Sequence, residues 1–270
     1  MHSLTRIETS IASAHLQRQI RLSILLPPGY FREEKPYPLL YFHDGQDFTA
    51  LDLEATMQRL ISAKEIPAFI CVGIHAPRDR HMVYGTAKQP DFAGRGAKAA
   101  LHSAFVREEL RPYLMRNYRI REGAAHQYVA GCSLGGLAAM DLVWHHPDCF
   151  SRVGVFSGSF WWRSRDLGQG YVEETDRIMH ALVRQGSYKP GLKFWFEAGT
   201  EDETSDRNQN GIIDAIEDTQ DLIWELWKKG YQPERDLRYF EVEGGRHNQE
   251  TWAQAIPHFL TWLFENAPTP

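Results

Sequence analysis

Short apolar runs alternate with longer segments of helical spacing along most of the chain. The first two runs, Ser3–Ile11 and Gln17–Leu26, alternate in short bursts and stop at Pro27-Pro28-Gly29, which predicts two antiparallel strands. A continuous run such as Pro38–Phe42 suits a strand that is buried on both faces of a sheet. Further strands are predicted at Phe69–Ile74, Gln127–Ala130, Val153–Phe156, Leu192–Ala198 and Leu237–Val242.

Segments of helical spacing separate these runs, and most of them follow a predicted strand directly. They are Leu51–Ala63, Ala99–Tyr113, Leu134–His146, Tyr171–Gln185, Ile216–Lys229 and Gln249–Glu265. Strands that alternate with helices imply an α/β fold with a mostly parallel central sheet and helices on both faces. Ligands of such sheets bind at the carboxyl ends of the strands. A long polar stretch, Ala76–Lys98, is expected to be a functional or mobile loop.

Length, composition and charge limit the domain count and the classes of binding partner, but they do not identify the function. A chain of 270 residues with 43% hydrophobic content can bury one large core, so we expect a single domain over residues 1–270. The net charge of -5 gives no electrostatic reason to bind nucleic acid or anionic lipid. No stretch is long and apolar enough to span a bilayer, and the first residues do not resemble a signal peptide, so a cytoplasmic location is expected.

The strongest chemical signal is Gly131-Cys132-Ser133-Leu134-Gly135, which matches the pattern G-x-S-x-G. It lies between a predicted strand and a predicted helix, where a sharp turn exposes a serine hydroxyl and the helix N-terminus favours developing negative charge. Small residues must flank a serine in such a turn. Ser133 is therefore the expected nucleophile of an α/β-hydrolase fold.

A serine hydroxyl needs a neighbouring base, and in this fold the base is a histidine near the C-terminus. Only His247 and His258 lie beyond residue 180, and His258 stands inside a predicted helix. His247 follows a strand and precedes the last helix, so it is the expected general base. The acid should follow the next-to-last strand, where Asp202 is the choice and Glu201 is the best substitute.

Two backbone N–H groups should form the oxyanion hole. One belongs to Leu134, directly after the nucleophile, and the other is expected from Gln46 in the loop after the Pro38–Phe42 strand. In that loop Asp44 and Gly45 are expected to face the substrate, and Gly45 permits close approach of the chain. The aromatic pair Trp161 and Trp162 is a further candidate for the pocket, although packing in the core explains it equally well.

These segments together resemble the putative esterase family of α/β-hydrolases. That family includes enterochelin, feruloyl and acetyl-xylan esterases, S-formylglutathione hydrolases and mycolyltransferases. The similarity covers roughly Arg21 to Leu263. Its carriers are Leu39-Leu40-Tyr41-Phe42-His43-Asp44-Gly45-Gln46, Gly131-Cys132-Ser133-Leu134-Gly135-Gly136, Phe156-Ser157-Gly158-Ser159, Gly199-Thr200-Glu201-Asp202 and Gly245-Arg246-His247 with Trp252. The resemblance implies that Asp202 is the triad acid and that the loop N–H of Gln46 serves the oxyanion hole.

A second motif, residues 206–217, fits the calcium loop of an EF-hand. Gly211 stands at the sharp turn, but the segment before the loop does not predict a helix, so the loop is closer to the lone calcium loops of dockerin-type repeats. We expect one structural Ca²⁺ that orders the stretch carrying Asp202. Its predicted ligands are Asp206, Asn208, Asn210, the carbonyl of Ile212, Asp214 and Glu217.

The sequence therefore predicts a serine esterase that forms an acyl-enzyme on a small-molecule or carbohydrate-linked ester. It predicts no organic cofactor. One alternative is an acyltransferase, which would use the same residues. The non-enzymatic alternative is a calcium-dependent binding module on a non-catalytic hydrolase scaffold. The chemical identity of the ester and the oligomeric state are not predicted.

Overall fold

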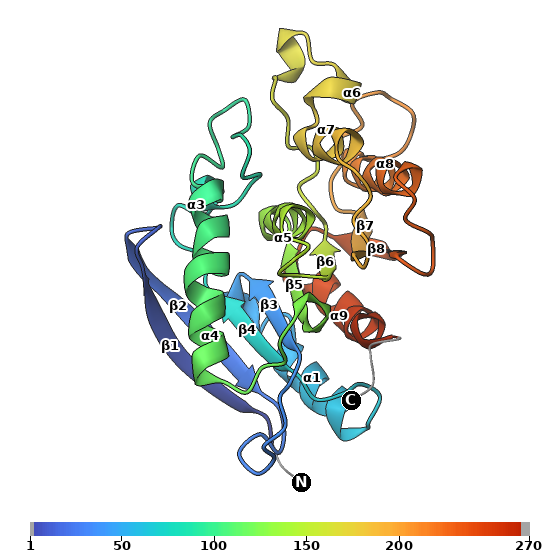
Figure 1. The fold of residues 1–270 in the computed structure, drawn as a ribbon. Helices are drawn as coiled ribbons and strands as arrows, with labels where there is room; N and C mark the ends of the chain where they lie inside the picture. Colours follow the sequence, from blue (N-terminus) through green and yellow to red (C-terminus); the bar gives the residue numbers. More distant parts are fainter. Residues whose placement is uncertain (1–2, 266–270) are drawn as a thin grey trace.

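The computed structural model describes residues 3–265 and contains one eight-stranded sheet (Figure 1). The strands lie in the order β1-β2-β4-β3-β5-β6-β7-β8. Among the described residues, the pairs β1–β2 and β2–β4 are antiparallel and every other pair is parallel, which confirms the predicted α/β class. The strands are β1 (Thr5–Ser13), β2 (Arg18–Leu26), β3 (Leu39–His43), β4 (Ile70–Ile74), β5 (Gln127–Cys132), β6 (Arg152–Phe156), β7 (Lys193–Glu201) and β8 (Leu237–Arg246).

Helices cover both faces of the sheet, as the alternation of strands and helices predicts. One face packs against the helices from α3 to α5 together with α7 and α8, whereas α1 and α9 pack against the other face. The α-helices are α1 (Leu53–Ser62), α2 (Arg80–Val83), α3 (Ala99–Ala104), α4 (Arg111–Asn117), α5 (Leu134–His145), α6 (Glu173–Asp176), α7 (Ile178–Gln185), α8 (Asp214–Lys228) and α9 (Gln249–Phe264). Four short helical turns complete the elements: η1 (Gly45–Asp47), η2 (Phe105–Leu110), η3 (Ala124–His126) and η4 (Leu167–Gln169).

The sheet register places the chemically interesting loops at one edge. Strand β3 lies between β4 and β5, and the pairing of β5 with β6 ends at Cys132 and Phe156. Because these strands are parallel, the loops that follow them leave the sheet on the same side. Residues after β3, β5, β6, β7 and β8 are therefore neighbours in space although they are far apart in sequence.

Three predicted elements differ from the structure. The helix expected over Tyr171–Gln185 is two helices, α6 and α7, because Arg177 between them has an extended backbone. The buried guanidinium of Arg177 pairs with Asp218 and Asp221 of α8, an interaction that local spacing does not reveal. The helix expected at Ala99–Tyr113 runs to Asn117 through the π-helical turn η2, and the long loop after β4 contains the short helix α2.

No helix within the described part of the chain is long and apolar enough to cross a membrane.

A buried arginine holds the last helix on the sheet. Arg152 begins β6 and is 5% exposed, and its Nη1 donates hydrogen bonds to the carbonyls of Leu263 at 2.7 Å and Glu265 at 3.0 Å. A third carbonyl, that of Trp262, lies 3.3 Å away. The last carbonyls of a helix have no partner within the helix, and a cation there also complements the helix dipole. Arg152 therefore stabilises the end of α9 and connects it to the central strands.

We expect Arg152→Met to lower the free energy of unfolding by about 2–4 kcal/mol, because three carbonyls at the end of α9 lose the guanidinium as a donor. Urea unfolding followed by fluorescence measures this change. The matched control is Arg116→Ala, since Arg116 is exposed on α4 and its loss should change stability by less than about 0.5 kcal/mol. Equal stability of the Arg152 variant and the wild type would contradict the assignment.

Candidate active site

Ser133 occupies the sharp turn between β5 and α5 in a strained backbone conformation, with φ 56° and ψ -123°. Residues other than glycine rarely adopt a positive φ, so the surrounding contacts must stabilise this backbone conformation. The Ser133 N–H donates to the carbonyl of Phe156 at 2.8 Å, and the Ser133 carbonyl accepts from the N–H of Ser159 at 3.2 Å. The turn is thus attached on both sides to the segment that follows β6.

The hydroxyl of Ser133 lies 3.4 Å from the hydroxyl of Ser159. Within residues 3–265, no hydrogen bond joins it to His247. A cavity of about 270 Å³ opens beside this region. Its walls come from the segment after β6, the loop after β7, the start of α8 and the loop after β8, and they are formed by Ser157, Gly158, Trp161, Asp202, Glu203, Ala215 and His247.

His247 lies in the loop between β8 and α9, and its side chain is 41% exposed. The backbone on either side is well held, because the N–H of Arg246 donates to the hydroxyl of Thr251 and the side chain of Asn248 caps α9. The imidazole packs edge-on against Trp252, with ring centroids 5.2 Å apart. The fold therefore fixes the loop and leaves the imidazole partly exposed beside the cavity.

Asp202 follows β7 and its carboxylate is fully buried, with Oδ2 at 3.9 Å from Nδ1 of His247. That separation is longer than a hydrogen bond. Both carboxylate oxygens are buried without a hydrogen-bond partner within the described residues. Burial of an unpaired carboxylate is costly, so a small rotation of the His247 ring toward Asp202 is favoured. Catalytic hydrogen bonds are often long without substrate and shorten when it binds.

The two acidic neighbours of Asp202 differ from it in their surroundings. Glu201, the substitute acid of the sequence prediction, is more than half exposed and its Oε2 pairs with Nε of Arg246 at 3.0 Å. Glu203 lines the cavity, and burial together with the charge of Asp214 raises the pKa of Glu203. Of the three carboxylates, only Asp202 combines full burial with proximity to His247.

Sequence reasoning missed Glu197, a fully buried acid on β7. Its Oε2 lies 3.5 Å from the hydroxyl of Ser157, and its Oε1 is buried with no hydrogen-bond partner in the described part of the chain. The same Ser157 hydroxyl accepts a hydrogen bond from Nε1 of Trp252 at 2.8 Å. Burial, and secondarily the nearby charge of Asp202, raises the pKa of Glu197 to about 8. A polar residue inside the apolar run Phe194–Ala198 was the available signal for this residue.

The two predicted oxyanion donors lie at or near the start of two helical segments. Leu134 is the first residue of α5, and Gln46 lies in η1 directly after β3. The side chain of Gln46 does not extend freely, because its Oε1 accepts from the N–H of Ala76 at 2.9 Å. Since β3 pairs with β5, both N–H groups belong to the same edge of the sheet as Ser133.

The predicted substrate pocket needs correction for three of its four residues. Trp161 lines the cavity, but Trp162 is fully buried and packs beneath the loop at Gly85 and Gly96. Gly45 is buried against the backbone of β4, and Asp44 is 3% exposed because its carboxylate pairs with Arg80. Trp162, Gly45 and Asp44 therefore offer no open surface to a substrate. Sequence adjacency could not distinguish the lining tryptophan from the core one.

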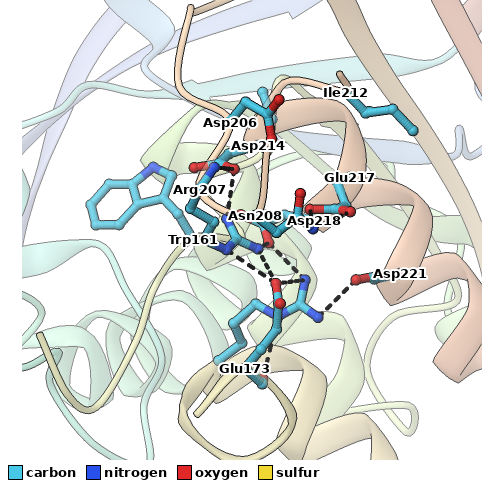
Figure 2. Close-up of polar contacts among 12 residues, drawn as sticks. Trp161, Glu173, Asp206, Arg207, Asn208, Ile212, Asp214, Glu217, Asp218 and Asp221 are labelled. Atoms are coloured by element: carbon cyan, nitrogen blue, oxygen red, sulfur yellow. Dashed lines mark hydrogen bonds and ion pairs between the residues drawn. The ribbon is translucent and has the colours of Figure 1, made fainter. Parts of the chain in front are cut away.

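The predicted calcium loop lies between β7 and α8, and Figure 2 shows its side chains at the start of that helix. The amide of Asn208 contacts both oxygens of Glu217, at 2.8 and 2.9 Å, and the amide of Asn210 contacts Oε1 at 2.5 Å. Asp206 closes the turn by accepting from the N–H groups of Asn210 and Gly211. Positions 3, 5 and 12 of the motif thus converge on one point, and position 1 stabilises the turn beside it.

The remaining motif positions contribute less to that point. Asp214 accepts from the N–H of Arg207 at 2.9 Å and pairs with the guanidinium of Arg207 at 3.3 Å. Ile212, whose carbonyl was the predicted ligand, has an exposed side chain. In the part of the chain that the structure describes, no group of three or more His, Cys, Asp and Glu side chains is arranged to hold a metal.

Arg207 joins the loop to helices α6 and α8. Figure 2 shows its guanidinium directed at Glu173 and Asp218, with Nε at 3.0 Å from the Glu173 carboxylate. Asp218 also accepts from Arg177 at 2.7 Å. This network of opposite charges connects the loop with α6, α7 and α8.

A family model described as "Putative esterase" matches residues 13–263. The chain is 21% identical over 255 residues to the uncharacterized protein YbbA of Bacillus subtilis (strain 168). The aligned region covers 93% of this chain and 95% of that protein. It is 23% identical over 254 residues to the iron(III) enterobactin esterase of Escherichia coli (strain K12), covering 94% of this chain and 56% of that enzyme. The chain thus spans little more than half the length of the enterobactin esterase.

The fold is similar to that of a solved ferulic acid esterase, with a TM-score of 0.73 at 17% sequence identity over 97% of this chain and 99% of that one. At this level of identity the likeness concerns the fold alone. The family model, in contrast, covers nearly the whole sequence, including the serine turn and the histidine loop. The protein belongs to the putative esterase family and is a carboxylic ester hydrolase with the α/β-hydrolase fold.

Proposed function

We propose that this protein hydrolyses small carboxylic esters through an acyl-enzyme on Ser133, with His247 as general base and Asp202 as the orienting acid. The observation that carries the proposal is the strained conformation of Ser133 at the carboxyl edge of the sheet, where the buried carboxylate of Asp202 lies 3.9 Å from His247. Strain and an unpaired buried charge are both costly, and they persist where function requires them.

The chemistry follows from the order of proton transfers. His247 takes the hydroxyl proton of Ser133 while the oxygen attacks the ester carbonyl, and the N–H groups of Leu134 and Gln46 donate to the oxyanion. The imidazolium then gives its proton to the departing alcohol as the acyl-enzyme forms. Water attacks the acyl-enzyme with the same base and releases the acid. Asp202 stays ionised and stabilises the imidazolium.

The cavity supports a small ester substrate. It holds about 270 Å³, and its lining includes the flat aromatic ring of Trp161 and the imidazole of His247. The guanidinium of Arg95 packs on the Trp161 ring at 4.8 Å and is fixed by Asp91, which orients that wall. A planar or sugar-linked group can stack on such a surface.

We expect Ser133→Ala and His247→Ala to lower kcat for an aryl ester by about 10⁴-fold or more, and Asp202→Asn by roughly 10³–10⁴-fold. A fluorophosphonate probe should label the wild type and leave the Ser133 variant unlabelled. Ser187→Ala, at an exposed position, is the matched control and should retain full activity. Labelling that survives in the Ser133 variant would contradict the proposal.

Analysis of the reaction products distinguishes hydrolysis from acyl transfer. Hydrolysis predicts that an added alcohol acceptor leaves the yield of free acid nearly unchanged. An acyltransferase would convert most of the acyl group to a new ester, and a non-catalytic module would produce neither.

Glu197 makes the stability of this site depend on pH. Its pKa is raised to about 8, so the folded protein holds this proton where the unfolded chain loses it near pH 4.5. The resulting stabilisation is fully present below pH 4.5 and is lost as the pH rises through about 8. We expect the wild type to lose on the order of 3 kcal/mol of stability between pH 6 and 8 that Glu197→Gln does not lose.

Urea midpoints of the wild type and the Gln variant at pH 6, 7 and 8 test this difference. Glu122→Gln makes the same chemical change at an exposed position and should keep the wild-type slope. Parallel pH profiles for wild type and Glu197→Gln would show that Glu197 ionises normally.

We further propose that residues 206–217 bind one Ca²⁺ through oxygens of Asp206, Asn208, Asn210, Ile212 and Glu217, with Asp214 as a further ligand. Support comes from the spacing of the motif and from the grouping of Asn208 and Asn210 around the Glu217 carboxylate, which accepts hydrogen bonds from their amide nitrogens. Ca²⁺ accepts carboxylate, amide and carbonyl oxygens. The loop bears on the active site, because Ala215 lines the cavity and the N–H of Asp214 donates to the carbonyl of Ser205.

We expect a calcium chelator to lower the melting temperature, since an ion at a hundred times its Kd adds about 2.7 kcal/mol of stability. Glu217→Gln should abolish the calcium-dependent shift, and Glu122→Gln should retain it. Calorimetric titration of the metal-free protein measures binding directly. No heat of binding and no shift in melting temperature would contradict the site.

A further inference from the structure

The two expected oxyanion donors come from different loops that leave the sheet after β3 and β5. The strands themselves are paired, with Phe42 opposite Ala130, but this pairing stops before Gln46 and Leu134. Beyond the last pair, the sheet no longer sets the distance between the two N–H groups. Some other contact must hold the loops in place if both donors are to reach one oxygen.

One guanidinium touches both loops. Arg80 of α2 forms a two-point ion pair with Asp44, with Nε at 2.8 Å from Oδ1 and Nη2 at 2.7 Å from Oδ2. The same Nη2 donates to the carbonyl of Cys132 at 3.1 Å, and Cys132 directly precedes Ser133. Arg80 thus joins the loop of Gln46 to the turn of the nucleophile, and planar two-point pairing fixes orientation as well as distance.

Asp44 itself needs such support. Its backbone is left-handed, with φ 63° and ψ 46°, and its side chain is 5% exposed. Its N–H donates to the hydroxyl of Tyr84 at 3.3 Å, and its Oδ1 accepts from the side chain of Gln46 at 3.3 Å. A strained residue with a buried charge persists only where several contacts determine it together. The position of Asp44 therefore transmits the position of Arg80 to Gln46.

The close approach of the two loops supports the same conclusion. A side-chain carbon at Gly135, the second residue of α5, would lie 2.8 Å from Oδ2 of Asp44. The carbonyl of Gly135 also lies 2.8 Å from Nδ1 of His43, the last residue of β3. Loop and helix start are in direct contact at this point, so a shift of either changes the separation of the two donors.

We infer that Arg80 is a positioning residue of the oxyanion hole, which holds the N–H groups of Gln46 and Leu134 at the separation that the tetrahedral intermediate requires. The inference rests on the proposed function. Arg80 does not touch the reacting atoms and acts through Asp44 and Cys132. Its loss should therefore weaken stabilisation of the transition state more than binding of the substrate.

The test compares Arg80→Ala and Arg80→Lys with the wild type on an aryl acetate. We expect Arg80→Ala to lower kcat about tenfold to hundredfold, less than the 10²–10³-fold that loss of a donor costs, with KM changed less than about threefold. Arg80→Lys keeps the charge but cannot make all three contacts, so its kcat should lie between those of the wild type and Arg80→Ala. Millimolar guanidinium should restore part of kcat in Arg80→Ala and none in Arg80→Lys.

A second readout separates positioning from general damage. An aryl boronic acid forms a bond from boron to the Ser133 oxygen while His247 accepts the proton, and the tetrahedral boronate places an oxygen in the hole. Its inhibition constant should rise in Arg80→Ala by about the factor by which kcat falls. Arg18→Ala is the matched control, because Arg18 pairs with Asp79 beside Arg80 and contacts neither Asp44 nor Cys132.

Two results would overturn the inference: a kcat of both Arg80 variants within threefold of the wild type, or a fall in kcat with unchanged boronate affinity. If Arg80→Ala does not fold, Arg80→Lys with a wild-type melting temperature carries the same comparison. A wild type that hydrolyses no ester, or a Ser133→Ala variant of full activity, would instead refute the proposed function and the inference with it.

Discussion

The positive φ of Ser133 is the constraint on which the site depends. A chain that leaves a buried strand and enters a helix within one residue must bring its neighbours very close together. A side-chain carbon at Gly131 would lie 2.5 Å from the carbonyl oxygen of Gly135, so only glycine permits this approach. The hydrogen bonds to Phe156 and Ser159 then hold the turn against the next strand. The turn therefore fixes the Ser133 hydroxyl, and the other site residues act according to where they lie relative to it.

Burial distinguishes the acids around the site more sharply than distance along the chain. Glu201 and Asp202 are adjacent in sequence, yet Glu201 is paired with Arg246 near the surface, whereas the Asp202 carboxylate is enclosed and has no hydrogen-bond partner among residues 3–265. Burial of Glu197, and secondarily the charge of Asp202, favours the neutral form of Glu197. Asp202 is the acid of this group that lies beside His247, with Oδ2 3.9 Å from Nδ1.

The region beyond the sheet is held by charge rather than by apolar packing alone. Arg177 and Arg207 share the buried carboxylate of Asp218, and Arg207 also reaches Glu173. These contacts join α6 and α8 to the loop whose end, Ala215, lines the cavity. On the other side of the site, Arg80 connects the loop after β3 to the serine turn. Both sets of contacts link segments that follow different strands.

The sequence by itself determined the features that depend on neighbours along the chain. Apolar periodicity predicted the strands and most helices, and the residue types around Ser133 predicted its turn, because both are local consequences of backbone geometry. Periodicity could not reveal the break at Arg177, whose partners on α8 are about forty residues away. Only the tertiary structure decided that Trp161 lines the cavity while Trp162 is buried, and that Glu197 is fully buried. It also decided that Asp44 pairs with Arg80 instead of facing a substrate. Burial and charge pairing are set by segments that meet only after the sheet has formed, so no local pattern encodes them.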